Sequence, residues 1–345
     1  PAARPGPRLG ARVGARVGAR LRAAGFSLPL DALLTATAIG DLAARVVPTR
    51  SPSAMPAPSG RPREPQGWWE LSSGQQRLLY LWQAAPGDPS YNVASALALE
   101  GALDTGAMRA AVAGLVTRHE MLRARFDVAH HPPRQRVDLE GPALEVCDVP
   151  ADAREPALLD WGNRPFDLVA GPPSRFVLLR HGPASATLLA CAHHIVVDRW
   201  SMDTLLADLA ALYTAALAGT SAALPALPAC FADHVTAERA LTPHEAAKGH
   251  WRGVTAEPAT RLLRDRVRPD DHRAAVVVRP LRRSGEFREA CRRLDLTPFM
   301  GLAAHVARWL AHATGTDEAR FGTIEAGRVS PAFEPVVGFF ANTVP

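Results

Sequence analysis

Thr187-Leu-Leu-Ala-Cys-Ala-His-His-Ile-Val-Val-Asp198 is the most informative run of residues in this chain. Its first six residues are small or apolar, which predicts a short buried strand. That strand ends at His193 and His194. Because neighbouring residues on a strand face opposite sides, we expect the two imidazoles to differ in role. One packs or orients, and the other faces an opening.

An imidazole is the side chain best suited to move a proton near neutral pH, so the histidine that faces an opening is a candidate acid–base group. Two adjacent histidines alone are more often part of a core. Asp198 follows after three apolar residues, and its carboxylate can fix the loop by pairing with an arginine. Ser201 is then expected to cap a helix over residues 202–217, with Asp203 in its first turn.

The histidine–aspartate run resembles the HHxxxDG signature of the condensation domains of nonribosomal peptide synthetases. Further matches occur in the family's order. Leu71-Ser-Ser-Gly-Gln-Gln-Arg-Leu78 resembles the opening pattern Ser-x-Ala-Gln-x-Arg-Leu, and Gly338-Phe-Phe-Ala-Asn-Thr343 resembles the late pattern Gly-x-Phe-x-Asn-Thr. Other matches lie at residues 86–92, 118–126, 165–168 and 322–328.

This resemblance implies an α/β fold of the chloramphenicol-acetyltransferase type, with two similar lobes in a V and a tunnel between them. A carrier-bound acyl thioester and a carrier-bound amine would meet in that tunnel. By analogy His194 is the functional histidine, which positions or deprotonates the amine, while His193 supports it and Asp198 is structural. Arg328 is the expected partner of Asp198, and Arg123 is the alternative.

The resemblance extends the predicted site beyond the histidines and Asp198. Trp200 and Ser201 resemble the class of condensation domain that joins two L-configured residues, and Asn342 belongs to the late pattern. Arg199 departs from the family, which has glycine at that position. Its side chain could narrow the tunnel, point outwards to a carrier phosphate, or signal an unusual substrate.

The chain is expected to contain consecutive segments of different kinds. Residues 1–47 resemble the helical C-terminal part of a peptidyl carrier protein, without the Gly-Gly-x-Ser turn that bears phosphopantetheine. Residues 48–67 are typical of a Pro- and Ser-rich linker. Residues 68–235 are predicted to form the N-lobe and residues 236–345 the C-lobe. Family members continue beyond the late pattern, so the second lobe is expected to be incomplete.

Hydrophobic periodicity predicts a mixed order of strands and helices from Trp68 onward. The expected strands are residues 91–100, 121–128, 134–139, 144–149, 175–180 and 187–192, with another near 319–325. The expected helices, besides 202–217, are residues 103–118, 242–252, 284–294 and 298–313.

Composition narrows the class of protein. The formal net charge is +5, and 47% of residues are hydrophobic, which is enough for a sizeable core. No nucleic-acid motif accompanies the basic surplus, and no apolar run approaches the roughly 18–20 residues of a membrane span. The 4 cysteines are far apart and form no CxxC, which argues against disulfides or zinc and suits the cytoplasm.

The sequence therefore predicts an acyltransferase that forms an amide bond when a carrier-bound amine attacks an upstream carrier-bound thioester. Its expected partners are the upstream and downstream peptidyl carrier domains and an adenylation domain in the same polypeptide, with no nucleic acid or membrane. Phosphopantetheine is expected on the carriers, and no cofactor or metal on this chain. The alternatives are a non-catalytic carrier-docking module of the same fold and a stand-alone acyltransferase that uses acyl-CoA.

Overall fold

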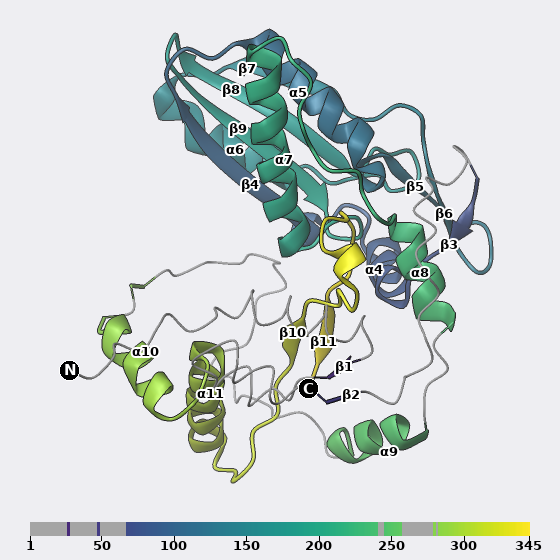
Figure 1. Cartoon of the computed structure of the whole chain (residues 1–345), viewed down its shortest axis with the longest axis vertical. Coiled ribbons are helices and arrows are strands. Elements are labelled where there is room, and N and C mark those ends of the chain that lie inside the picture. Colours follow the sequence, from purple (N-terminus) through teal and green to yellow (C-terminus); the bar gives the residue numbers. More distant parts are fainter. Residues whose placement is uncertain (1–25, 28–46, 49–66, 241–244, 257–278, 281) are drawn as a thin grey trace. The chain divides into compact units, whose positions relative to one another are not determined.

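The computed structural model describes residues 26–27, 47–48, 67–240, 245–256, 279–280 and 282–345 (Figure 1). The chain divides into two compact units. The sheet unit comprises residues 55–242 and 325–342, and the helical unit comprises residues 1–54, 243–324 and 343–345. Residues 325–342, which the sequence predicts in a C-lobe, therefore group with the sheet unit.

A four-stranded sheet in the order β4-β9-β8-β7 forms the centre of the sheet unit (Figure 1). β9 is buried over residues 186–193, whereas alternate residues of β4 are exposed. The apolar run thus forms an inner strand covered on both faces, and it places the two histidines at a fixed end of the sheet. The strands are β4 (Asn92–Glu100), β7 (Leu144–Asp148), β8 (Ser174–Gly182) and β9 (Ser185–His193).

Pairing within this sheet is antiparallel, except that β7 runs parallel to β8. The register places Asn92 of β4 opposite His193 and Ser174 of β8 opposite Ala192. Both neighbours of β9 therefore extend to its last residues, and they support the backbone up to the point where the histidines begin.

Helices cover this sheet. α5 (Thr105–Arg118) packs on α7 (Arg199–Leu217) and contacts β7, whereas α6 (Arg154–Asn163) packs against β4, β8 and β9. Asp104 caps the start of α5: its carboxylate accepts a hydrogen bond from the Ala107 N–H at 2.9 Å. Its buried side chains recur three and four residues apart, as one face of a helix requires: Met108, Ala111, Val112, Leu115 and Val116.

A smaller sheet and two further helices complete the sheet unit. The sheet has the order β3-β6-β5, and α4 (Ser73–Ala84) starts beside it at a capping box. In that box Ser72 Oγ accepts from the Gln75 N–H, while the Gln75 side chain accepts from the Ser72 N–H, each at 3.1 Å. The remaining elements are β3 (Trp69–Glu70), β5 (Ala124–Asp127), β6 (Arg134–Val137) and α8 (Phe231–Ala240).

The helical unit contains α9 (Glu245–Val254), α10 (Ser284–Arg293) and α11 (Pro298–Thr314), and α10 packs on α11. Two short strand pairs also occur: β1 (Phe26–Ser27) pairs antiparallel with β2 (Val47–Pro48), and β10 (Thr323–Glu325) pairs with β11 (Asn342–Val344). No helix in the described part of the chain combines the length and apolar character that a bilayer crossing requires.

The helix after the histidine motif begins earlier than the sequence predicts. α7 starts at Arg199, and Asp198 caps it by accepting a hydrogen bond from the Ser201 N–H at 2.7 Å. Ser201 was expected to be the cap; it lies inside the first turn because the carboxylate three residues upstream reaches its N–H. The predicted carrier-like segment 1–47 and the linker 48–67 lie outside the described residues, apart from β1, β2 and Gly67.

Shortening a side chain of β9 tests the central position of that strand. Leu189 is 2% exposed, and removing buried methyl groups costs about 2–5 kcal/mol of unfolding free energy. We expect Leu189→Ala to show a loss of that size in urea unfolding followed by circular dichroism. Leu139 is 64% exposed, so the control Leu139→Ala should lose less than about 0.5 kcal/mol. Equal losses in the two variants would contradict this description of the core.

Candidate active site

The two histidines lie where β9 ends and the chain turns toward α7. The His193 N–H donates to the Pro173 carbonyl oxygen and the His194 N–H to the Tyr91 carbonyl oxygen, each at 2.8 Å. The Val196 N–H donates back to the His193 carbonyl oxygen at 3.0 Å. Backbone hydrogen bonds therefore fix the turn to the segments that lead into β8 and β4.

The hydrogen bonding of His194 defines its tautomer. Its Nδ1 lies 2.7 Å from the Val197 carbonyl oxygen, and because a carbonyl oxygen can only accept, Nδ1 carries the proton. Nε2 of the neutral ring then has an available lone pair, and within the described residues it has no hydrogen-bond partner. The side chain is half-buried. It can therefore accept a proton from an amine, or orient that amine, at Nε2.

His193 has the opposite tautomer. The Ile195 N–H donates to His193 Nδ1 at 3.1 Å, so this nitrogen is unprotonated and the neutral ring carries its proton on Nε2. Burial, with a smaller contribution from His194, lowers the pKa of His193 to about 4. His193 is thus a buried neutral ring that fixes the turn, as the alternating geometry of a strand predicts for one of the two histidines.

The Asp198 carboxylate is saturated with hydrogen bonds. Its Oδ1 accepts from the Ser201 N–H at 2.7 Å and from Arg328 Nη2 at 3.1 Å. Its Oδ2 accepts from Arg328 Nη1 at 2.6 Å and from the Phe340 N–H at 3.3 Å. Asp198 is 3% exposed, and both oxygens are occupied. This carboxylate is therefore a structural tie rather than a base, and the expected pair with Arg328 is present.

Arg328 links Asp198 to residues 325–342, the segment in which Arg328 itself lies. Besides pairing with Asp198, its Nη2 donates to Ser201 Oγ at 3.0 Å and to the Val336 carbonyl oxygen at 3.3 Å. Its guanidinium also lies over the rings of Phe340, at 4.2 Å, and Trp200, at 5.4 Å. One buried cation thus holds the start of α7 and the segment 325–342 together.

Ser201 and Gly327 allow segment 325–342 to lie close to the start of α7. Ser201 Oγ donates to the Gly338 carbonyl oxygen at 2.9 Å and accepts from the Gly338 N–H at 3.1 Å. Gly327 has a φ of +67°, and a Cβ there would lie 1.9 Å from the Phe340 carbonyl oxygen. Any other residue at 327 would force the segment away from Asp198.

The other predicted site residues lie around this cluster or apart from it. Trp200 donates from Nε1 to the Glu334 carbonyl oxygen at 3.0 Å. Arg199 is 85% exposed and pairs with Asp203 at 3.3 Å, so its side chain points outwards. Arg123, the alternative partner for Asp198, instead donates to the backbone carbonyl oxygens of Val116 and Asp138.

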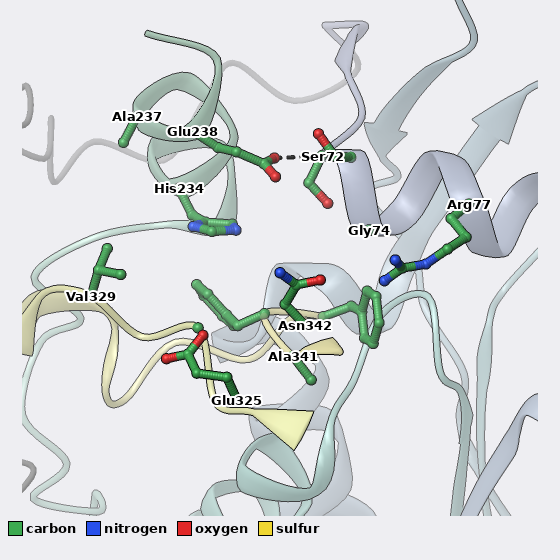
Figure 2. Close-up of a pocket in the computed structure, with 14 residues that line it drawn as sticks. Ser72, Gly74, Arg77, His234, Ala237, Glu238, Glu325, Val329, Ala341 and Asn342 are labelled. Atoms are coloured by element: carbon green, nitrogen blue, oxygen red, sulfur yellow. Dashed lines mark hydrogen bonds between the residues drawn. The ribbon is translucent and has the colours of Figure 1, made fainter. Parts of the chain in front are cut away.

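A cavity of about 310 Å³ lies beside the start of α4 (Figure 2). Asn342, the last of the predicted residues, lines it together with Arg77 and His234. Burial, and secondly the Arg328 cation, lowers the pKa of His234 to about 4. Glu238 also lines the cavity and accepts a hydrogen bond from the Ser73 N–H at 3.0 Å. The cavity walls are thus mixed in charge.

Two buried glutamines support the site and were not singled out from the sequence. Gln75 is fully buried, and its Nε2 donates to the Ile195 carbonyl oxygen at 3.2 Å and to Gln135 Oε1 at 2.9 Å. Gln135 Nε2 donates back to Gln75 Oε1 at 2.7 Å. The opening pattern therefore holds the histidine turn directly. Burying a glutamine without hydrogen-bond partners is unfavourable. The position of Gln75 on the inner face of an amphipathic helix is therefore the signal that could have indicated a structural role.

Two cysteine thiols of the sheet unit, those of Cys191 and Cys230, are poor nucleophiles. Burial, partly offset by Arg175, raises the pKa of Cys191 to about 11, and burial followed by Glu120 raises that of Cys230 to about 12. Both remain protonated near neutral pH, which argues against a thiolate nucleophile at these positions. In the described residues no group of three or more His, Cys, Asp or Glu side chains is arranged to hold a metal ion.

Comparison with known proteins gives a consistent result. The model of the family described as "Condensation domain" matches residues 66–345. The chain is 35% identical over 294 residues to the isonitrile lipopeptide synthase of Mycobacterium tuberculosis, covering 79% of this chain and 12% of that protein. It is 36% identical over 313 residues to the phosphinothricin tripeptide synthetase PhsC of Streptomyces viridochromogenes, covering 85% of this chain and 29% of that protein.

The solved structures agree on the fold. The first condensation domain of the calcium-dependent antibiotic synthetase, in complex with a substrate analogue, superposes with a TM-score of 0.69 at 22% identity, covering 82% of this chain and 69% of that one. The expected α/β fold of the chloramphenicol-acetyltransferase type is therefore confirmed. The chain spans less than a third of the length of the two synthetases above.

The Asp198–Arg328 pair predicts a non-additive loss of stability. Removing one partner leaves the other charge buried and unpaired, so Asp198→Ala and Arg328→Ala should each lower the unfolding free energy by about 3–5 kcal/mol. The double variant should lose less than the sum of the two. As a control, Asp148→Ala breaks the exposed pair with Arg180 and should cost at most about 1 kcal/mol. Additive losses in urea unfolding would contradict the coupling.

The two buried histidines with lowered pKa values, His193 and His234, predict acid sensitivity. Each has a folded-state pKa of about 4, so the unfolded chain binds the proton first as the pH falls below about 6.5. Each should contribute on the order of 3 kcal/mol at pH 7 that is lost by about pH 4. His234→Phe removes one group and keeps an aromatic ring, so its loss of stability between pH 7 and pH 4 should be smaller than that of the wild type by about 3 kcal/mol. An unchanged pH slope would contradict this.

Proposed function

The chain belongs to the condensation-domain family of nonribosomal peptide synthetases, and on that premise we propose that it joins two carrier-bound substrates through an amide bond. The amine nitrogen of a downstream aminoacyl group attacks the carbonyl carbon of an upstream acyl or peptidyl thioester. A C–N bond forms, the C–S bond breaks, and the upstream carrier regains its thiol. The lengthened chain remains on the downstream carrier.

The tautomer of His194 supports this proposal most directly. Because Val197 holds the proton on Nδ1, Nε2 can accept a hydrogen bond from the attacking amine. As the C–N bond forms, the amine nitrogen becomes acidic, and its proton passes to Nε2 and then to the leaving thiolate. His194 also keeps the amine in place before attack, which contributes to the rate without any change of protonation.

His193 and Asp198 are proposed to hold His194 in position. His193 is proposed to hold the turn as a neutral buried ring, and Asp198 to anchor the end of the turn through Arg328. Neither group has an oxygen or nitrogen lone pair left for a substrate proton, since His193 Nδ1 and both Asp198 oxygens already accept hydrogen bonds. The amine is thus proposed to attack the thioester directly, with no covalent intermediate on this chain.

The partners follow from the proposed reaction. Both substrates arrive as thioesters on the phosphopantetheine arms of carrier domains, one upstream and one downstream, and an adenylation domain in the same polypeptide supplies the downstream residue. The relatives are synthetases that this chain matches over a small part of their length, which supports a role as one domain among several. Trp200 and Ser201 favour two L-configured substrates, and we place the protein in the cytoplasm, where carriers are loaded.

A reconstituted condensation assay tests this function. An upstream carrier is loaded with an L-aminoacyl group and a downstream carrier with a second amino acid, and dipeptide on the downstream carrier is measured by mass spectrometry. His194→Ala should lower the rate by about 100-fold or more, because it removes both proton acceptor and anchor. The matched control is His130→Ala, since His130 is an exposed loop histidine and its loss should leave the rate unchanged.

Other outcomes would assign a different role. Normal product with His194→Ala would refute the role of that residue. If the chain binds loaded carriers and never forms dipeptide, it is a carrier-docking module of the same fold. If soluble acyl-CoA donates as fast as the loaded upstream carrier, the chain is a stand-alone acyltransferase.

A further inference from the structure

Phe339 contacts the ring of His194 and is not among the residues that the family signature specifies. The two ring centroids lie 5.0 Å apart, and the ring planes meet at 75°, an edge-to-face arrangement that aromatic rings favour. Phe339 is 7% exposed and lines the cavity beside α4. In the late pattern Gly-x-Phe-x-Asn-Thr it occupies the first unspecified position. Its identity can therefore differ without loss of the pattern.

The backbone on either side of Phe339 is anchored. The Gly338 N–H donates to Ser201 Oγ at 3.1 Å, and the Phe340 N–H donates to Asp198 Oδ2 at 3.3 Å. Because both flanking peptides are tied to the start of α7, the main chain at Phe339 has little freedom to shift. Its ring can change position only by rotation of the side chain.

Gly74 is the residue on α4 that makes room for this ring. A Cβ at position 74 would lie 2.8 Å from Phe339 Cε1 and 3.1 Å from Cδ1, closer than carbon atoms normally approach. The start of α4 is also fixed, because Gln75 completes the capping box with Ser72 and donates to the Ile195 carbonyl oxygen at 3.2 Å. With both backbones held, a methyl group at position 74 must displace the Phe339 ring.

We propose that Phe339 is a positioning residue for His194, and that Gly74 provides the space that this role requires. The hydrogen bond from Nδ1 to the Val197 carbonyl oxygen fixes one atom of the imidazole, and the ring can still tilt about that bond. The Phe339 edge contact restricts this tilt and so fixes the direction of Nε2. The inference rests on the proposed condensation function of His194, because Nε2 is the atom whose direction it explains.

A double-mutant cycle in the condensation assay measures the coupling between Phe339 and Gly74. Phe339→Leu lacks the Cε and Cζ atoms that reach toward position 74, and it removes the aromatic contact with His194. We expect it to lower kcat about three- to tenfold at saturating carriers, the change equivalent to one edge-to-face contact. KM for the carriers should stay within about twofold, because Phe339 acts through His194.

Gly74→Ala should lower kcat by a similar factor with Phe339 present, because the displaced ring no longer restrains the imidazole. In the Phe339→Leu background the same change should cost less than about twofold, since the Cε1 atom that the added Cβ would approach most closely is absent. Displacing the packed ring should lower thermal stability, and the higher helix propensity of alanine offsets part of that loss, so kcat is compared at a temperature where every variant is fully folded. The matched control is Gly162→Ala on α6, where an added Cβ meets nothing within 4 Å and kcat should stay unchanged.

The outcomes separate this inference from the proposed function. If the wild-type chain forms dipeptide while Gly74→Ala and Phe339→Leu both keep its kcat, the positioning role is refuted and the condensation function stands. Additive effects in the double variant, or a rise in KM at constant kcat, would equally refute it. If the wild-type chain forms no dipeptide with loaded carriers, the proposed function itself fails.

Discussion

The buried ion pair between Asp198 and Arg328 is the interaction on which the rest of the site depends. The aspartate caps α7, while the arginine comes from a segment 130 residues later in the chain. A buried charge pair is stable only when its remaining hydrogen-bonding capacity is used. Here Ser201, the Phe340 N–H and the Val336 carbonyl oxygen use most of it, while the buried Arg328 Nε has no hydrogen-bond partner among the described residues. The same contacts that satisfy the charges therefore fix the late segment against the histidine turn.

This anchoring gives the two adjacent histidines different chemistry. The turn between β9 and α7 is held at one end by the sheet and at the other by Asp198. Within it, His193 accepts a backbone N–H and is buried as a neutral ring, whereas His194 donates to a backbone carbonyl and keeps Nε2 available. Of the two histidines, His194 is therefore the one with a ring nitrogen open to a substrate. The division arises from backbone geometry, since both side chains are identical.

The sequence predicted much of this arrangement because short-range patterns determine it. The apolar run before His193 indicated an inner strand, and alternation indicated that the histidines differ, while the resemblance to the family implied Arg328 as the first choice for the partner of Asp198. What it could not predict depends on contacts between distant segments. The burial of Gln75 against Ile195, and the fit of Phe339 against Gly74, appear only when α4 and the late segment meet. The cap of α7 was misplaced because Asp198 and Ser201 are both good caps, and the ion pair that orients Asp198 lies outside any local window.

The two neighbouring histidines hold opposite tautomers, so that of the two only His194 has an unprotonated Nε2. Nitrogen-15 NMR of the imidazole rings, in chain labelled at histidine and assigned with His193→Gln and His194→Gln, measures this directly. At pH 7.5 we expect a protonated Nδ1 and an unprotonated Nε2 for His194, and the reverse for His193. The same tautomer in both rings, or a protonated Nε2 in His194, would contradict it.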